Sequence, residues 1–255
     1  MKIDKKKMVT FLKKVNMEGE NKIEEAMFDF GEKGLNVKTY SSTNVVMVDA
    51  LLKKEAFEEY EAFGRVGVQY ISKVIRVFDS FDKTLDISLN ESMMIIKEDK
   101  KSVDFTLFVD DEEPIPSKPH TFDEEFMVSN IGVKSFISDV LLNDDYVIRL
   151  ETKPETLIMK NTKGNFRFVR EFNLSEVKGV RKDKDAEGNE VEVKGVITNF
   201  GKPIVEAIVN LTKDFYFGFS HNSYIRIREV TDDSTVELFV APRLDDDATI
   251  NVSNE

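Results

Sequence analysis

Apolar residues recur at helical spacing in four stretches of the chain, and each stretch predicts a helix that buries one face. The stretches are residues 4–15, 69–81, 130–142 and 202–213. Asp4 is expected to cap the first helix, and Pro203 suits the first turn of the fourth. In the third helix, Leu141 is expected on the inward stripe.

Short alternating or β-rich segments lie between these helices and predict strands. In the first half they are residues 25–30, 35–40, 45–52, 57–68, 84–89, 92–97 and 103–109. In the second half they are residues 126–128, 146–151, 156–160, 166–172, 191–198, 216–219, 224–229 and 235–240. The order of elements matches between the halves, although their sequence identity is negligible. An α+β chain of two similar domains, each with two helices, is predicted.

The best candidate linker is residues 110–125, where four consecutive acids precede Pro114, Pro116 and Pro119. Such a composition is unsuited to a helix interior or a central strand. We therefore predict an N-terminal domain at residues 1–109, a connector at 110–125 and a C-terminal domain at 126–247. The polar residues 248–255 are expected to form a flexible tail.

Composition narrows the class of protein. The chain of 255 residues is 41% hydrophobic and 33% charged, and it has no apolar run near the roughly 20 residues that cross a bilayer. Without cysteine, disulfides, thiolate catalysis and cysteine-ligated metals are excluded. No secretory signal is indicated, so an intracellular protein is expected.

Positive charge is concentrated locally, against a formal net charge of −12. Five lysines crowd onto the first predicted helix: Lys5, Lys6, Lys7, Lys13 and Lys14. The second helix repeats a polar stripe with Lys73 and Arg76. Either stripe alone is also explained as a solvated helix face. Their recurrence favours contact with a polyanion at selected places.

Little in the sequence indicates an enzyme. His120 and His221 are the only imidazoles, and neither belongs to a nucleophile or metal motif. Acidic clusters at residues 110–113, 123–125 and 245–247 are expected to be solvated rather than to hold Mg²⁺. Gly-rich phosphate loops are absent. We therefore expect no catalytic activity, no metal and no cofactor.

The chain resembles, over nearly its full length, a DNA sliding clamp of the proliferating cell nuclear antigen (PCNA) family. No one motif is specific alone, but their order and spacing together carry the resemblance. The motifs are Leu12-Lys13-Lys14-Val15, Glu25-Ala26-Met27-Phe28-Asp29-Phe30, Gly34-Leu35-Asn36-Val37, Ser41-Ser42-Thr43-Asn44-Val45, Phe57-Glu58-Glu59-Tyr60, Ser72-Lys73-Val74-Ile75-Arg76, Ile115-Pro116 and Val240-Ala241-Pro242-Arg243-Leu244-Asp245-Asp246. The resemblance implies two clamp domains, each with two helices on antiparallel sheets. It also implies a ring of three subunits whose helices line a hole around duplex DNA.

A ring that slides needs basic side chains that contact phosphates and no readers of base edges. The positions expected to face DNA are Lys6, Lys13, Lys14, Lys73, Arg76, Lys134, Lys202 and Lys213. Asp139 and Glu206 lie near the lysines of the second half, where the family commonly carries more positive charge. Contact with DNA is therefore expected to differ between the domains.

The resemblance also implies a hydrophobic pocket under the connector that takes a short helical peptide with aromatic anchors. The matching positions are Tyr40, Asn44, Val45, Ile115, Pro116, Tyr224, Ala241 and Pro242. Simple core packing is the alternative explanation for Tyr40, Val45 and Tyr224. Asn44 stands where many members have histidine, and Glu113 stands where an apolar residue is common.

Ring closure in the family pairs an edge strand of one subunit with an edge strand of the next. The matching segments are residues 103–109 and 166–171. Within them, the expected interface residues are Val103, Phe105, Leu107, Phe166, Phe168 and Arg170. Pairing between subunits would also remove the aggregation hazard of an open edge.

The function predicted from these features is that of a polymerase processivity factor, located with DNA in an archaeon, a virus-infected cell or a nucleus. Expected partners are double-stranded DNA, a DNA polymerase, a clamp loader and other replication and repair proteins. A homotrimer is preferred because both edges occur in one chain. One alternative is a subunit of a heteromeric clamp or a non-ring scaffold. Another is a β-rich ligand-binding protein unrelated to DNA, which leaves the basic stripes unexplained.

Overall fold

The computed structural model describes residues 1–17, 19–90, 92–108, 115, 124–153, 156–173, 175–178, 182–184, 190–192, 197–219 and 224–243. The chain forms two compact units. Unit 1 contains Met1–Lys118 together with Glu229–Leu238, and unit 2 contains Pro119–Arg228 together with Phe239–Glu255. A short segment near the C-terminal end of the sequence therefore belongs to the first unit.

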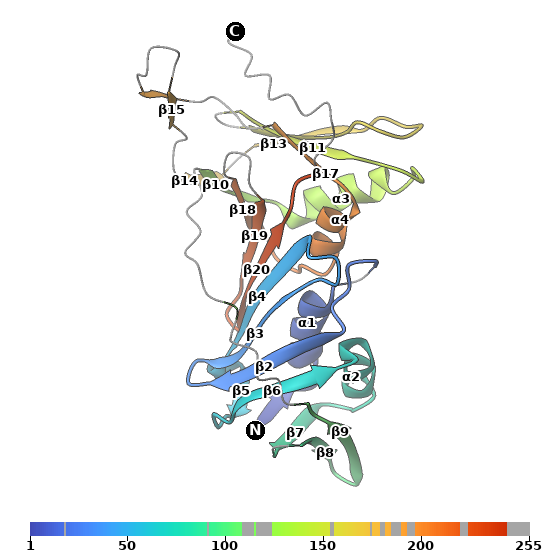
Figure 1. Ribbon diagram of the computed structural model, residues 1–255, viewed down its shortest axis with the longest axis vertical. Coiled ribbons are helices and arrows are strands. Elements are labelled where there is room, and N and C mark those ends of the chain that lie inside the picture. Colours follow the sequence, from blue (N-terminus) through green and yellow to red (C-terminus); the bar gives the residue numbers. More distant parts are fainter. Residues whose placement is uncertain are drawn as a thin grey trace. The chain divides into compact units, whose positions relative to one another are not determined.

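The described residues of unit 1 form two α-helices, one 3₁₀ helix and two antiparallel sheets (Figure 1). Its elements are β1 (Lys2–Asp4), α1 (Lys5–Asn16), β2 (Glu25–Gly31), β3 (Gly34–Tyr40), β4 (Val46–Lys53), the 3₁₀ helix η1 (Lys54–Ala56), β5 (Phe57–Glu59), β6 (Gly64–Gln69), α2 (Ile71–Asp79), β7 (Thr84–Leu89), β8 (Met93–Glu98) and β9 (Lys101–Thr106). One sheet has the strand order β5-β1-β7-β8-β9. The other contains β4-β3-β2-β6 and is extended by β20 (Ser234–Val240).

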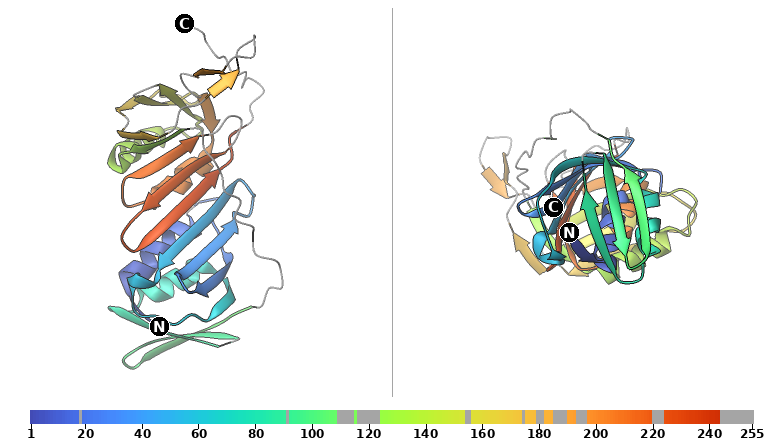
Figure 2. Two further views of the ribbon diagram at one scale, coloured as in Figure 1. Left: turned by 90° about the vertical axis from the view of Figure 1, so that its left-hand side faces the viewer. Right: turned by 90° about the horizontal axis from the view of Figure 1, so that it is seen from below.

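The core of unit 1 lies between its helices and the inner face of the sheet that contains β2 and β3. Alternate residues of β2 are buried, among them Phe28 and Phe30, as the two-residue period of a half-buried strand requires. Helix α1 contributes Phe11 and Leu12 to this core, and α1 packs against α2. Figures 1 and 2 show both helices on one face of the sheet, and Figure 2 shows its other face uncovered by the described helices.

Unit 2 repeats this design with different residues. Its elements are β10 (Glu124–Val128), α3 (Asn130–Val140), β11 (Ile148–Lys153), β12 (Thr156–Asn161), β13 (Val169–Asn173), β14 (Ser175–Lys178), β15 (Lys182–Lys184), β16 (Glu190–Glu192), β17 (Ile197–Phe200), α4 (Lys202–Val209), β18 (Phe215–Phe219) and most of β19 (Ile225–Val230). The sheets have the orders β13-β12-β11-β17 and β14-β10-β18-β19, with β15 and β16 as a separate pair. Helix α3 packs against α4. No helix in the described ranges is long and apolar enough to cross a membrane.

All four predicted helices are present, but the second-half helices end early. Helix α4 stops at Val209, four residues before its predicted end. The reason lies in α3, because the Asn130 amide and the Lys134 ammonium both donate to the Leu211 carbonyl, at 3.2 and 2.5 Å. These side chains hold the backbone after α4 in place of a further helical turn. Leu141, predicted to point inward, lies past the last residue of α3 and is exposed.

The prediction of a single strand at residues 57–68 is wrong. The segment forms β5 and β6, which belong to different sheets and pair with β1 and β2. Between them the Tyr60 hydroxyl donates to the Gly31 carbonyl at 2.8 Å, and the Phe63 amide donates to the Phe30 carbonyl at 2.9 Å. Gly64 then adopts a φ of +103°, which interrupts an extended run and suits glycine.

Two other predicted strands are also divided or shortened. Residues 191–198 contribute to both β16 and β17, which lie in different sheets. The strand predicted at 166–172 begins only at Val169. Before it, the Asn143 and Asn161 side chains accept from the amides of Phe166 and Phe168, at 2.8 and 2.5 Å. Side chains thus satisfy backbone groups that a strand would have paired.

The segment Glu229–Leu238 is held in unit 1 by lysines of that unit. Its first residue, Glu229, forms an ion pair with Lys14 of α1, and their side chains are only 0% and 2% exposed. Lys7 pairs with Asp233 at 2.8 Å, and Lys53 of β4 donates to the carbonyls of Thr231 and Asp232 at 2.9 and 3.0 Å. The turn between β19 and β20 is therefore fastened to α1 and β4.

Lys14→Met is expected to lower the free energy of unfolding by about 3–5 kcal/mol, because Glu229 would remain buried without its charged partner. The double variant Lys14→Met/Glu229→Leu should recover most of that loss. Urea titration followed by circular dichroism, at fixed protein concentration, measures both. Lys7→Met is the matched control, since its partly exposed pair is worth about 1 kcal/mol or less. Equal effects of Lys14→Met and Lys7→Met would contradict the prediction.

Candidate functional site

Helix α1 presents part of the predicted basic surface. The Asp4 carboxylate caps the helix by accepting from the amides of Lys6 and Lys7, at 2.8 and 3.2 Å. The predicted apolar stripe of Met8, Phe11, Leu12 and Val15 is buried. This orientation leaves Lys6 and Lys13 exposed. Both are placed where a phosphate could reach them.

The prediction that Lys14 faces DNA is wrong. Its ammonium is buried against Glu229, so it offers no charge at the surface. The sequence does not reveal this partner, because a lysine beside an apolar stripe gives no indication of a carboxylate more than 200 residues away. Lys5 is likewise engaged, since it donates to the Phe81 carbonyl at 2.7 Å. The lysine-rich start of the chain therefore serves the fold as well as the surface.

Helix α2 presents a second basic face in unit 1. Ile71, Val74, Ile75 and Phe78 are buried as predicted, and Lys73 and Arg76 are exposed. The helix begins after Tyr70, whose φ of +56° is left-handed. Glu24 serves as its cap, because the carboxylate accepts from the Ser72 amide at 3.1 Å and from the Ser72 hydroxyl at 2.7 Å. Lys22 also pairs with Glu24, at 2.9 Å.

The environment of Glu24 favours its charged form. Partial burial acts to raise the pKa of this carboxyl, but the hydrogen bonds from Lys22 and Ser72 outweigh that effect. The net result is a pKa below the ordinary value. Glu24 is therefore an ionised cap at neutral pH, which also complements the positive end of the helix dipole.

The second-half lysines differ from one another. Lys202 and Lys213 are exposed, Lys202 at the start of α4 and Lys213 beyond its end. Lys134 is half-buried, and its ammonium contacts the Leu211 carbonyl. Asp139 and Glu206 are half-buried on α3 and α4. Unit 2 thus carries an acid on the same helix as Lys134 and another on the same helix as Lys202.

The residues predicted for the partner pocket fall in both units. In unit 1, Tyr40 is exposed at the end of β3, and Asn44 lies in a turn with a φ of +57°. That turn is fixed because the Ser41 hydroxyl accepts from the Val46 amide at 3.1 Å. Val45 is partly exposed there, and Ile115 is partly exposed as well.

In unit 2, the Tyr224 ring packs edge-on against Phe239, with centroids 5.6 Å apart. Ala241 is exposed and Pro242 is half-buried, both just after β20. Pro116 and Glu113 lie outside the described residues, as do His120 and His221. The pocket itself stays a prediction.

The two segments predicted to join subunits contain strands at the edges of their sheets: β9 in unit 1 and β13 in unit 2. Val103 and Phe105 are half-buried on β9, and the Phe105 ring packs edge-on against Phe78 of α2 at 6.1 Å. Leu107 is buried in the core of unit 1, so the prediction that its side chain lines the edge is wrong. Its neighbour Phe108 explains this, because it leaves the sheet edge to form a bridge with Gly67.

The edge of unit 2 exposes more apolar surface than the sequence indicated. Phe166 is exposed in the loop before β13, Phe168 is half-buried, and the Arg170 guanidinium donates to the Gly132 carbonyl at 2.9 Å. Val169 on β13 and Ile131 on α3, which were not predicted as site residues, are 68% and 83% exposed. Both elements contact each other in the fold. The sequence did offer one indication of Ile131, because it is an apolar residue that lies outside the buried stripe of its helix.

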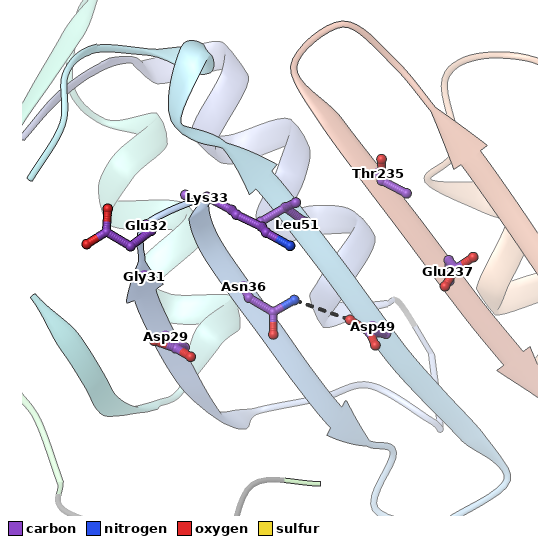
Figure 3. Close-up of a pocket in the computed structure, with 10 residues that line it drawn as sticks. Asp29, Gly31, Glu32, Lys33, Asn36, Asp49, Leu51, Thr235 and Glu237 are labelled. Atoms are coloured by element: carbon purple, nitrogen blue, oxygen red, sulfur yellow. Dashed lines mark hydrogen bonds between the residues drawn. The ribbon is translucent and has the colours of Figure 1, made fainter. Parts of the chain in front are cut away.

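A hollow of about 580 Å³ lies in unit 1 and is lined by none of the predicted site residues. Its lining includes four carboxylates, from Asp29, Glu32, Asp49 and Glu237 (Figure 3). Within the lining, the Asn36 amide donates to Asp49 of the neighbouring strand at 3.2 Å (Figure 3). In the described part of the chain, no group of three or more histidine, cysteine, aspartate or glutamate residues is placed to hold a metal ion.

The fold is that of PCNA-type sliding clamps, and the described residues form four α-helices and several antiparallel sheets. A structure of A. fulgidus PCNA bound to the C-terminal region of FEN-1 is similar with a TM-score of 0.76 and 18% identity, covering 96% of this chain and 98% of that chain. PCNA from Entamoeba histolytica gives 0.74 and 14%, covering 95% and 98%. A PCNA2–PCNA3 complex from Sulfolobus tokodaii gives 0.73 and 16%, covering 95% and 99%.

Sequence comparison places the chain within one family. The family model for the N-terminal domain of proliferating cell nuclear antigen matches residues 3–133, just over half of the chain. The protein is therefore a member of the PCNA family. The comparison with curated proteins gave no match.

Glu24→Gln is expected to lower the free energy of unfolding by about 1 kcal/mol at pH 7, the usual loss when a helix cap is removed. Because the folded-state pKa is depressed, the contribution of the carboxylate is complete above the unfolded pKa and is lost as pH falls through the folded pKa. The difference between the proteins should hold down to about pH 5 and shrink below about pH 4.

Urea titrations at neutral pH and at about pH 3.5 measure this difference. Glu25→Gln, at an exposed position next along the chain, is the control and should leave stability unchanged at both pH values. An undiminished effect of Glu24→Gln at the lower pH would show that the charge of Glu24 is irrelevant to the cap.

Proposed function

We propose that this protein is a DNA sliding clamp: a ring of three subunits that encircles duplex DNA and tethers replication and repair enzymes to it. The observation that carries the proposal is that one chain combines two open sheet edges, β9 and β13, with basic helix faces on an acidic protein. Membership of the PCNA family and the fold support it.

Charge distribution is consistent with sliding. Lys6, Lys13, Lys73 and Arg76 are exposed on α1 and α2, and they can contact phosphates regardless of sequence. The overall charge of −12 opposes diffuse adsorption to nucleic acid elsewhere. Contacts to phosphates carry no sequence information, so they favour no one position along the DNA.

Partner binding is proposed in unit 1, at the residues around Tyr40, Asn44 and Val45. The positions Ile115, Pro116, Tyr224, Ala241 and Pro242 are assigned to partner binding from the family resemblance alone. Exposed aromatic and apolar side chains next to a fixed turn are suited to a short hydrophobic peptide. The similar A. fulgidus clamp was solved with the C-terminal region of FEN-1, which supports peptide-carrying enzymes as the partner class. In this function the chain positions enzymes and has no catalytic residues of its own.

Subunit joining is proposed between β9 of one copy and β13 of the next. Edge strands offer unpaired backbone groups, and the exposed Val169, Phe166 and Ile131 add apolar contact. A homotrimer follows most simply because both edges occur in one chain. A heteromeric ring is the second candidate, because a similar structure joins two different subunits, PCNA2 and PCNA3.

Light scattering at several protein concentrations should give a mass of three times 29.3 kDa. Val169→Asp should shift the mass toward the monomer, because it places a charge in the proposed apolar seam. Val230→Asp is the matched control, since Val230 is also exposed but lies on neither edge strand. A stable wild-type monomer would contradict the homotrimer and favour the heteromeric ring.

Retention on DNA tests encirclement. The protein should co-elute with a nicked circular plasmid and should be lost when a single cut makes the plasmid linear. Lys13→Ala and Arg76→Ala should weaken retention and reduce the salt slope of binding by roughly 0.9 for each phosphate that is no longer neutralised. Lys54→Ala, an exposed lysine outside α1 and α2, should change neither. Equal retention on circular and linear DNA would overturn the proposal of a ring around DNA.

A further inference from the structure

An exposed aromatic residue stands at the start of the basic helix α2. Tyr70 immediately precedes α2 and is 55% exposed. The Lys73 ammonium lies over its ring, 4.2 Å from the centroid. An ammonium at this distance from an aromatic face is attracted by the quadrupole of the ring. The side chain of a residue in the proposed DNA-contact surface is therefore held by a neighbour that sequence analysis did not select.

The backbone fixes Tyr70 in this place despite an unfavourable conformation. Its φ of +56° lies in the left-handed region, which bulky residues rarely adopt. The Tyr70 carbonyl accepts from the amides of Lys73 and Val74, at 2.7 and 3.0 Å. The amides of the next two residues, Ile71 and Ser72, donate to Glu24. Hydrogen bonds to the Tyr70 carbonyl and from the residues that follow it thus hold this strained backbone, and strain of this kind is concentrated at functional sites.

The Tyr70 ring restricts the conformations of the Lys73 side chain. A lysine on a solvated helix face samples many rotamers, and this freedom is lost when it contacts a phosphate. A side chain that already rests on an aromatic ring loses less on binding. The phenol adds a second group, because its hydroxyl is a hydrogen-bond donor of the kind that contacts DNA phosphates.

We propose that Tyr70 and Lys73 act as one unit in contacting the DNA backbone, with the ring positioning the ammonium and the hydroxyl donating to the same strand. This inference rests on the proposed function, since it requires α2 to face DNA. It adds to that function an aromatic contact that reads no base and therefore permits sliding.

Binding of a fluorescein-labelled 30-base-pair duplex, followed by anisotropy over a series of salt concentrations, tests the inference. Tyr70→Asn is the main variant, because asparagine tolerates the left-handed backbone and so removes the ring without added strain. It should weaken binding about two- to fivefold, the size of an exposed cation–π contact, with little change in salt slope. Tyr70→Phe keeps the ring and isolates the contribution of the hydroxyl.

Lys73→Ala should weaken binding and reduce the salt slope by roughly 0.9 if its ammonium neutralises one phosphate. In a Lys73→Ala background, Tyr70→Asn should have a smaller effect than in the wild type, because the positioning role is already gone. Phe63→Ala, at another exposed aromatic of unit 1, is the control and should bind as the wild type does. Melting temperatures of all variants check that the fold is retained.

The possible failures are distinguishable. If Lys73→Ala weakens binding but Tyr70→Asn does not, or if the two effects are additive, the inference is overturned and the proposed function stands. If Lys73→Ala and Arg76→Ala both bind DNA as the wild type does, α2 is not a DNA-facing surface. In that case the proposed contact surface fails together with the inference.

Discussion

The buried ion pair between Lys14 and Glu229 is the interaction on which the first unit most depends. Neither charge has access to water, so each is tolerated only because the other is present. The pair joins a helix at the start of the chain to a turn near its end. Together with the contacts of Lys7 and Lys53, it holds the segment Glu229–Leu238 against the N-terminal part of unit 1. The fold of this unit is therefore non-local.

Because several lysines bind acceptors within the fold, fewer positive charges are left to contact DNA. Of the five lysines on α1, Lys5, Lys7 and Lys14 bind acceptors within the fold. Lys6 and Lys13 are exposed on the helix surface. Helix α2 supplements them with Lys73 and Arg76. An acidic protein that presents a few cations on helix faces can hold a polyanion without adhering to it over its whole surface. Weak, sequence-independent contact is what the proposed function requires.

The edges of the sheets also leave groups available for contacts outside the chain. β9 and β13 are edge strands and have unpaired backbone groups. Such groups promote aggregation of an isolated chain, but they can also pair with another subunit in an assembly. Exposed apolar residues gather near the β13 edge, whereas β9 packs Phe105 back onto α2. The two edges are therefore chemically unlike, as expected for surfaces that meet each other rather than themselves.

The sequence by itself determined the helices, most strands, the buried stripes and the Asp4 cap, because these depend on periodicity and on neighbours within a few residues. Tertiary structure decided which side chains are available. Lys14 and Leu107 are buried by partners distant in the sequence, Leu141 is exposed because α3 ends before it, and residues 57–68 divide between two sheets. Local pattern fixes which face of an element is apolar. What covers each residue depends on segments that meet only in the folded chain.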